Sequence, residues 1–97
     1  MYKGTVITLG DTEFTVAPLT FKQLRTLEPE LITLESMSTR PTSEQQDAVM
    51  RIIHASVSRN NPEVSLDDMG DLIDMGNLRP AIEAVMGVSG LVSKSGE

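Results

Sequence analysis

Cysteine and tryptophan are absent from this chain of 97 residues, and aromatic side chains are few. Without cysteine there is no disulfide scaffold, no thiolate metal site and no cysteine nucleophile, a composition that fits a reducing compartment. Tyr2, Phe14 and Phe21 are the only aromatic residues, so stacking platforms for bases or sugars cannot be built in number. The chemistry of the chain must come from aliphatic, hydroxyl, amide and charged side chains.

Long apolar runs are also missing. No stretch approaches the roughly 18 apolar residues of a transmembrane helix. The start, Met1-Tyr2-Lys3-Gly4, leads directly into strand-like alternation without the apolar core of a signal peptide. We therefore expect a soluble protein that stays in the cytoplasm and does not enter a membrane.

Positive charge is scarce. Eight basic residues stand against fourteen acidic ones, which gives a net charge of -6, and the basic residues are scattered along the chain. Binding to phosphate backbones or to anionic membrane surfaces needs a concentrated basic face. The charge pattern therefore predicts that the protein binds no nucleic acid and no membrane.

The length indicates one domain with a core of its own, which needs no disulfide or metal. We expect this domain to span residues 1–92 and residues 93–97 to form a flexible C-terminal tail.

A β-hairpin is expected at residues 4–17. Thr5–Leu9 and Glu13–Ala17 are rich in β-branched and aromatic residues. Gly10-Asp11 is typical of a two-residue turn, and Gly10-Asp11-Thr12 also fits a bulged hairpin with a positive φ at the glycine. In the second strand Phe14 and Val16 are expected to face the core, while Glu13, Thr15 and Ala17 meet water. Because two strands alone are marginally stable in water, the hairpin must pack on a helix or pair with another chain.

The rest of the chain has helical periodicity, with about four short helices expected at residues 20–37, 43–59, 66–75 and 78–87. The fold class is therefore α+β, mostly α: an N-terminal hairpin followed by a compact helical array. Thr20 and Gln23 have the spacing of a capping box at the first start. Pro29 is expected to kink that helix or to split it near Glu28.

The later helices carry their own start signals. Thr42 or Ser43 is expected to cap the second helix, Ser65 with Asp68 the third, and Asn77 the fourth. The inner face of the third helix is expected to hold Leu66, Met69 and Ile73.

No catalytic or metal-binding constellation is found. Four aspartates between residues 67 and 74 lack the spacing and central glycine of a calcium loop, so they are interpreted as a solvated helix face, or as an acidic docking surface for a basic partner. His54 is followed one turn later by Ser58 without an oxyanion motif. It is interpreted as a surface histidine beside an Asp47–Arg51 ion pair. We expect no enzyme activity, no cofactor and no small-molecule substrate.

The order of these signals resembles a known family. The hairpin, the segments 18–24 (PLTFKQL) and 61–69 (NPEVSLDDM), and Asn77-Leu78 with Ser89-Gly90-Leu91 are similar to the small tail assembly chaperones of long-tailed bacteriophages and prophages. The resemblance implies a non-enzymatic protein that binds the tape measure protein in the host cytoplasm, supports tail morphogenesis and self-associates as a homo-oligomer.

A chaperone for a long helical protein needs shallow apolar grooves, which leucine and methionine stripes on short helices can provide. The methionines fit either such a surface or an irregular core. Two alternative functions stay open: a structural virion subunit, such as a head-tail connector or tail completion protein, and an unrelated small regulatory protein-binding module. The candidate contact residues are Phe21, Leu24, Leu27, Leu31, Met69 and Leu72.

Overall fold

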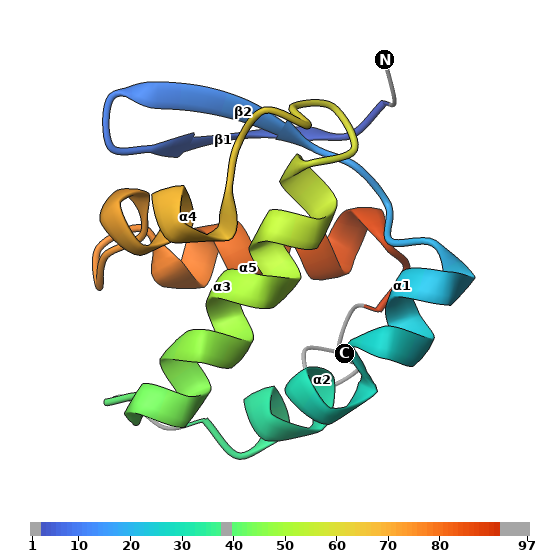
Figure 1. Ribbon diagram of the computed structural model, residues 1–97, viewed down its shortest axis with the longest axis vertical. Helices are drawn as coiled ribbons and strands as arrows, with labels where there is room; N and C mark the ends of the chain where they lie inside the picture. Colours follow the sequence, from blue (N-terminus) through green and yellow to red (C-terminus); the bar gives the residue numbers. More distant parts are fainter. Residues whose placement is uncertain (1–2, 38–39, 92–97) are drawn as a thin grey trace.

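The computed structural model describes residues 3–37 and 40–91 and confirms the α+β, mostly α class (Figure 1). The expected tail, 93–97, lies outside the described residues. The hairpin forms one end of the molecule, and the helices lie beneath it. In chain order the elements are β1 (Thr5–Leu9), β2 (Thr12–Val16), α1 (Phe21–Thr26), α2 (Glu28–Glu35), α3 (Ser43–Val57), α4 (Leu66–Leu72) and α5 (Leu78–Val88).

The hairpin has a two-residue turn in which Leu9 pairs with Thr12. Gly10 has a φ of +64° and Asp11 does not have a positive φ, which is the pattern of a type II′ turn. The strands are antiparallel, and their inward side chains, from Ile7, Leu9, Phe14 and Val16, are buried as the alternation predicts.

The expectation that Ala17 meets water is wrong, because Ala17 is fully buried where the chain leaves the sheet. Its amide donates to the carbonyl of Ser56 at 3.4 Å, and its carbonyl accepts from the Ser56 hydroxyl at 2.6 Å. Opposite this point a Cβ on Gly4 would lie 1.6 Å from the Val16 carbonyl oxygen, so only glycine fits there. The end of β2 is thereby fastened to α3.

The first predicted helix is split in two, as Pro29 indicated. α1 ends at Thr26 and α2 begins at Glu28, with Pro29 in the first turn of α2. The missing N–H of proline does little harm in a first turn. The Thr20–Gln23 capping box is present, and the Gln23 side chain also donates to the Ala55 carbonyl of α3 at 3.1 Å.

The ends of the later helices differ from the prediction. α3 ends at Val57 and α4 at Leu72, each before its expected end. Thr42 caps α3, and Ser65 with Asp68 caps α4, as predicted. Ile73, expected on the inner face of the third helix, has extended backbone just past its end, and Leu66 is 38% exposed.

Asn77 occupies the N-cap position of α5, as predicted, but its side chain does not cap the helix. The Asn77 side chain makes no cap hydrogen bond and instead accepts from the Asp74 amide at 2.9 Å and donates to the Leu72 carbonyl at 2.9 Å. It therefore stabilises the turn that follows α4.

The core is centred on α3, which crosses the middle of the molecule and contacts α2, α4, α5 and β2 (Figure 1). Its inner side chains have at most 1% exposed surface, and one continuous cluster joins them to the hairpin, to α4 and to α5. These α3 residues are Val49, Ile52, Ile53 and Val57.

None of the helices in the described ranges is long and apolar enough to cross a membrane.

Candidate protein-binding surfaces

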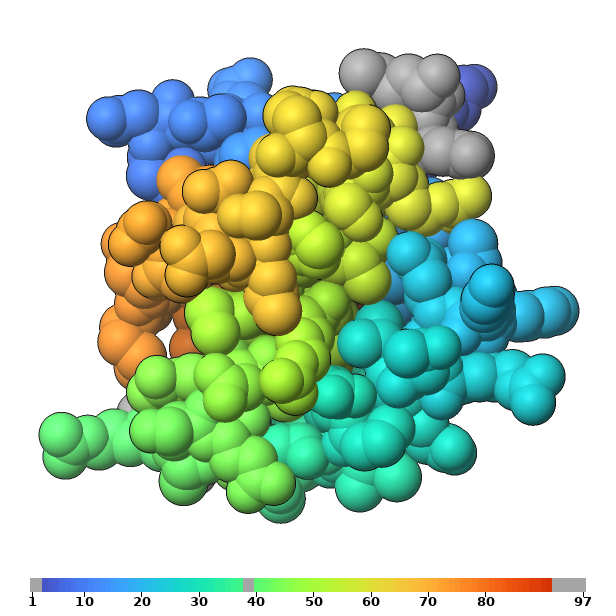
Figure 2. All heavy atoms as spheres, viewed as in Figure 1, coloured from blue at the N-terminus to red at the C-terminus, as the bar shows by residue number. Residues whose placement is uncertain are grey.

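The six candidate contact residues do not form one surface. Phe21 is 86% exposed on α1, and Figure 2 shows side chains of this part of the chain, in cyan, projecting from one side of the molecule. Leu24, Leu31 and Leu72 are half-buried on three different helices.

Leu27 and Met69 belong to the core. Leu27 is 7% exposed at the junction of α1 and α2, and Met69 is fully buried on α4. Both pack into the cluster centred on α3, and neither is accessible to a partner in this structure.

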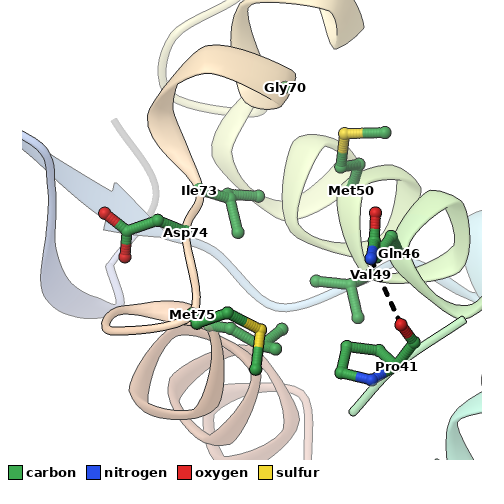
Figure 3. Close-up of a pocket in the computed structure, with 9 residues that line it drawn as sticks. Pro41, Gln46, Val49, Met50, Gly70, Ile73, Asp74 and Met75 are labelled. Atoms are coloured by element: carbon green, nitrogen blue, oxygen red, sulfur yellow. Dashed lines mark hydrogen bonds between the residues drawn. The ribbon is translucent and has the colours of Figure 1, made fainter. Parts of the chain in front are cut away.

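An apolar pocket lies where the start of α3 faces the end of α4 and the start of α5 (Figure 3). Its volume is 330 Å³, at the lower end of the roughly 300–1,000 Å³ of ligand sites. We call it the methionine pocket. Its lining residues are Pro41, Gln46, Val49, Met50, Gly70, Ile73, Asp74, Met75 and Leu78.

Two walls of the methionine pocket are methionines. Met75 is 61% exposed and Met50 is half-buried, and both side chains border the hollow in Figure 3. A Cβ on Gly70 would meet the Met50 sulfur at 3.6 Å, so the missing side chain of Gly70 leaves room there. Unbranched thioether side chains can adjust to differently shaped apolar groups.

Hydrogen bonds fix the backbone around the methionine pocket. The side-chain Nε2 of Gln46 donates to the Pro41 carbonyl at 3.2 Å, which holds the segment before α3 against that helix. The Asp74 carboxylate points away from the hollow and accepts from the amides of Gly76 at 2.8 Å and Asn77 at 2.9 Å. Asp74 therefore shapes the turn that carries Met75.

Sequence reasoning missed this pocket. The predicted inner face of the third helix included Ile73. Met50 on α3, Met75 in the turn after α4 and Leu78 at the start of α5 are brought together only in the folded chain. The one available signal was the number of methionines, which did not separate core from surface.

A second hollow, of 540 Å³, lies between α1, α2 and α3 and is lined by charged as well as apolar residues. Within it Arg51 pairs with Glu30 of α2 at 3.2 Å, in place of the predicted pair with Asp47. The His54 Nε2 atom lies 2.8 Å from the Val64 carbonyl oxygen, and the Ser58 hydroxyl donates to the Ala55 carbonyl at 3.2 Å. The structure therefore gives His54 and Ser58 separate partners.

The aspartates of residues 67–74 are exposed, as a solvated face requires. The Asp68 carboxylate accepts from the Ser65 amide at 3.0 Å and so completes the cap of α4. Among the residues that the structure describes, no group of three or more His, Cys, Asp or Glu side chains could hold a metal ion.

Comparisons of the chain with protein-family models, with curated proteins and with solved structures found no match.

Proposed function

We propose that this protein is a tail assembly chaperone of a long-tailed phage or prophage, which acts by binding the tape measure protein without catalysis or a cofactor. The proposal combines the sequence resemblance with one structural observation, the methionine pocket. Its setting would be the host cytoplasm during tail morphogenesis.

The methionine pocket suits a helical partner. Helices bind in apolar grooves through side chains spaced three or four residues apart, and a hollow of 330 Å³ can accept such anchors. Met50 and Met75 can adapt their side chains to successive anchors of different shape. A protein that escorts many segments of a long chain needs this tolerance.

The test is co-expression with the tape measure product encoded beside this gene, scored by solubility and co-purification. The informative variant is Met75→Glu, which places a charge at the mouth of the pocket. The matched control is Ile32→Glu, because Ile32 on α2 is 59% exposed against 61% for Met75 and does not line the pocket.

We expect the wild type and Ile32→Glu to keep the tape measure product soluble, and Met75→Glu to lose at least about tenfold in recovered complex, because the charge would be desolvated on binding. A tape measure product that stays equally insoluble with the wild type, without co-purification, would refute the chaperone proposal. Recovery of the protein from purified mature virions would favour a structural subunit instead.

A further inference from the structure

The two edges of the hairpin differ in the hydrogen bonds that they receive from the rest of the fold. On β2, the outward carbonyl of Thr15 accepts from the Asn60 side chain at 3.0 Å, and the following Ala17 is bonded to Ser56 of α3. On β1, within residues 3–37 and 40–91, no hydrogen bond joins Thr5–Leu9 to anything outside the hairpin. Within the described residues, the fold therefore bonds the β2 side of the hairpin near its end and leaves the outward groups of β1 without a partner.

The register identifies the groups on the open edge. In a hairpin with a two-residue turn, Leu9 and Thr12 form a hydrogen-bonded pair. Bonded and non-bonded pairs alternate along the ladder, so Thr8 makes no backbone hydrogen bond with Glu13, and Val6 makes none with Thr15. The amides and carbonyls of Val6 and Thr8 therefore point away from β2. They form a short template for one more strand.

The edge carries none of the usual features that prevent strand pairing. Thr5–Leu9 contains no charge, no proline and no bulge, and Val6 is 58% exposed. A hollow of 400 Å³ also lies between this strand and the start of α5. The α5 side of that hollow is formed mainly by small side chains, including Pro80, Ala81 and Ala84. They leave room for an added strand beside β1.

We propose that a second copy of this chain occupies the β1 edge, in an antiparallel dimer with its two-fold axis at Ile7. In this register Val6 lies opposite Thr8 of the second copy, and each such pair exchanges both N–H···O bonds. The two hairpins then form one continuous four-stranded sheet with the two β2 strands on the outside. A symmetric contact of this kind closes on itself and does not extend into a fibre.

The charges at the two ends of this segment favour a second copy as the partner. In the same register Lys3 of each chain faces Asp11 of the other chain. The residues from 4 to 10 are uncharged. Lys3 and Asp11 are both exposed, and neither forms an ion pair in the part of the chain that the structure describes. The segment from Lys3 to Asp11 is therefore complementary to itself when antiparallel, although two chains of charge -6 repel elsewhere.

The experiment measures self-association of the full chain by sedimentation over a concentration series. Val6→Lys places like charges on the paired edge and is expected to give a monomer. The matched control, Ile32→Lys, changes a side chain on α2 that is 59% exposed against 58% for Val6, and it is expected to dimerise as the wild type does. Circular dichroism of each variant verifies that the monomer fold is intact.

A charge swap tests the register. Lys3→Asp alone or Asp11→Lys alone should weaken the dimer roughly tenfold, because each replaces two attractive pairs with two repulsive ones. The double variant Lys3→Asp/Asp11→Lys should restore the wild-type dissociation constant. Hydrogen exchange should show Val6 and Thr8 amides gaining protection as concentration rises.

Three results would overturn the dimer. They are a wild type that stays monomeric at every concentration, a dimer that Val6→Lys leaves intact, or a double variant no tighter than the single ones. Since none of these measurements involves a tape measure protein, the dimer and the chaperone function can fail separately.

Discussion

At the scale of single residues, Ser56 shows how one buried polar group joins two parts of the fold. It is fully buried on α3, its hydroxyl donates to the Ala17 carbonyl at 2.6 Å, and its carbonyl accepts from the Ala17 amide at 3.4 Å. A buried carbonyl without a donor costs free energy because water cannot replace the lost bond. Ser56 therefore fixes where β2 ends and where the chain turns toward α1.

Replacing Ser56 with alanine is expected to lower the free energy of unfolding by about 1–3 kcal/mol, because the Ala17 carbonyl loses its hydroxyl donor in a buried site. Urea denaturation measures the change. The control is Ser58→Ala, since the half-buried Ser58 hydroxyl bonds only the nearby Ala55 carbonyl, and it should cost less. Equal losses in the two variants would contradict this role of Ser56.

At the scale of elements, α1 depends on its ends more than on its length. It has six residues and none of them is buried, whereas α3 has fifteen residues with six buried. Helices this short are marginal in isolation, so the Thr20–Gln23 box and the Gln23 contact with Ala55 must supply much of its stability.

Thr20→Ala is expected to destabilise α1 by about 0.5–2 kcal/mol and to raise amide exchange throughout that helix. Thr42→Ala removes the same kind of box from α3, where burial of the helix confines the effect to the first turn. Hydrogen exchange of the two variants makes the comparison. Loss of protection over all of α3 in Thr42→Ala, or no loss over α1 in Thr20→Ala, would show that α1 does not depend on its cap more than α3 does.

At the scale of the whole molecule, the hairpin and the helices share one core. Leu9 and Val16 of the hairpin and Ile52 of α3 are fully buried in the same cluster. A two-stranded hairpin is at best marginally stable in water, so it depends on α3 and α5. We therefore expect the domain to unfold as one cooperative unit.

Leu9→Ala and Ile52→Ala should each lower the free energy of unfolding by about 2–5 kcal/mol while leaving a single transition, because both open a cavity in one core. Thermal and urea unfolding, followed by circular dichroism and by NMR of hairpin amides, provide the measurement. A hairpin that melts separately from the helices in either variant would show two independent units.

Much of the fold is local and could be predicted. The hairpin follows from β-branched residues around Gly10-Asp11, and the helix starts follow from short side chains that bond amides three residues ahead. The split at Pro29 follows from its missing amide. Asn77 stands at the N-cap of α5 as predicted, but its side chain bonds Leu72 and Asp74 instead of the helix, an arrangement that depends on the turn.

The candidate sites were much less predictable. Leu24 and Leu27 have the same side chain and lie on one predicted stripe, but Leu27 is buried in the core and Leu24 is half-buried beside it. Met69 and Met75 also have the same side chain, fully buried in one case and 61% exposed in the other.

By itself, the sequence determined the elements, because capping, turn and proline chemistry act within a few residues. Only the tertiary structure decided which apolar side chains are covered, which strand edge stays open, and that Met50 and Met75 border one pocket. Burial and edge covering depend on segments far apart in the chain, such as Asn60 bonding Thr15, and a local pattern does not contain that information.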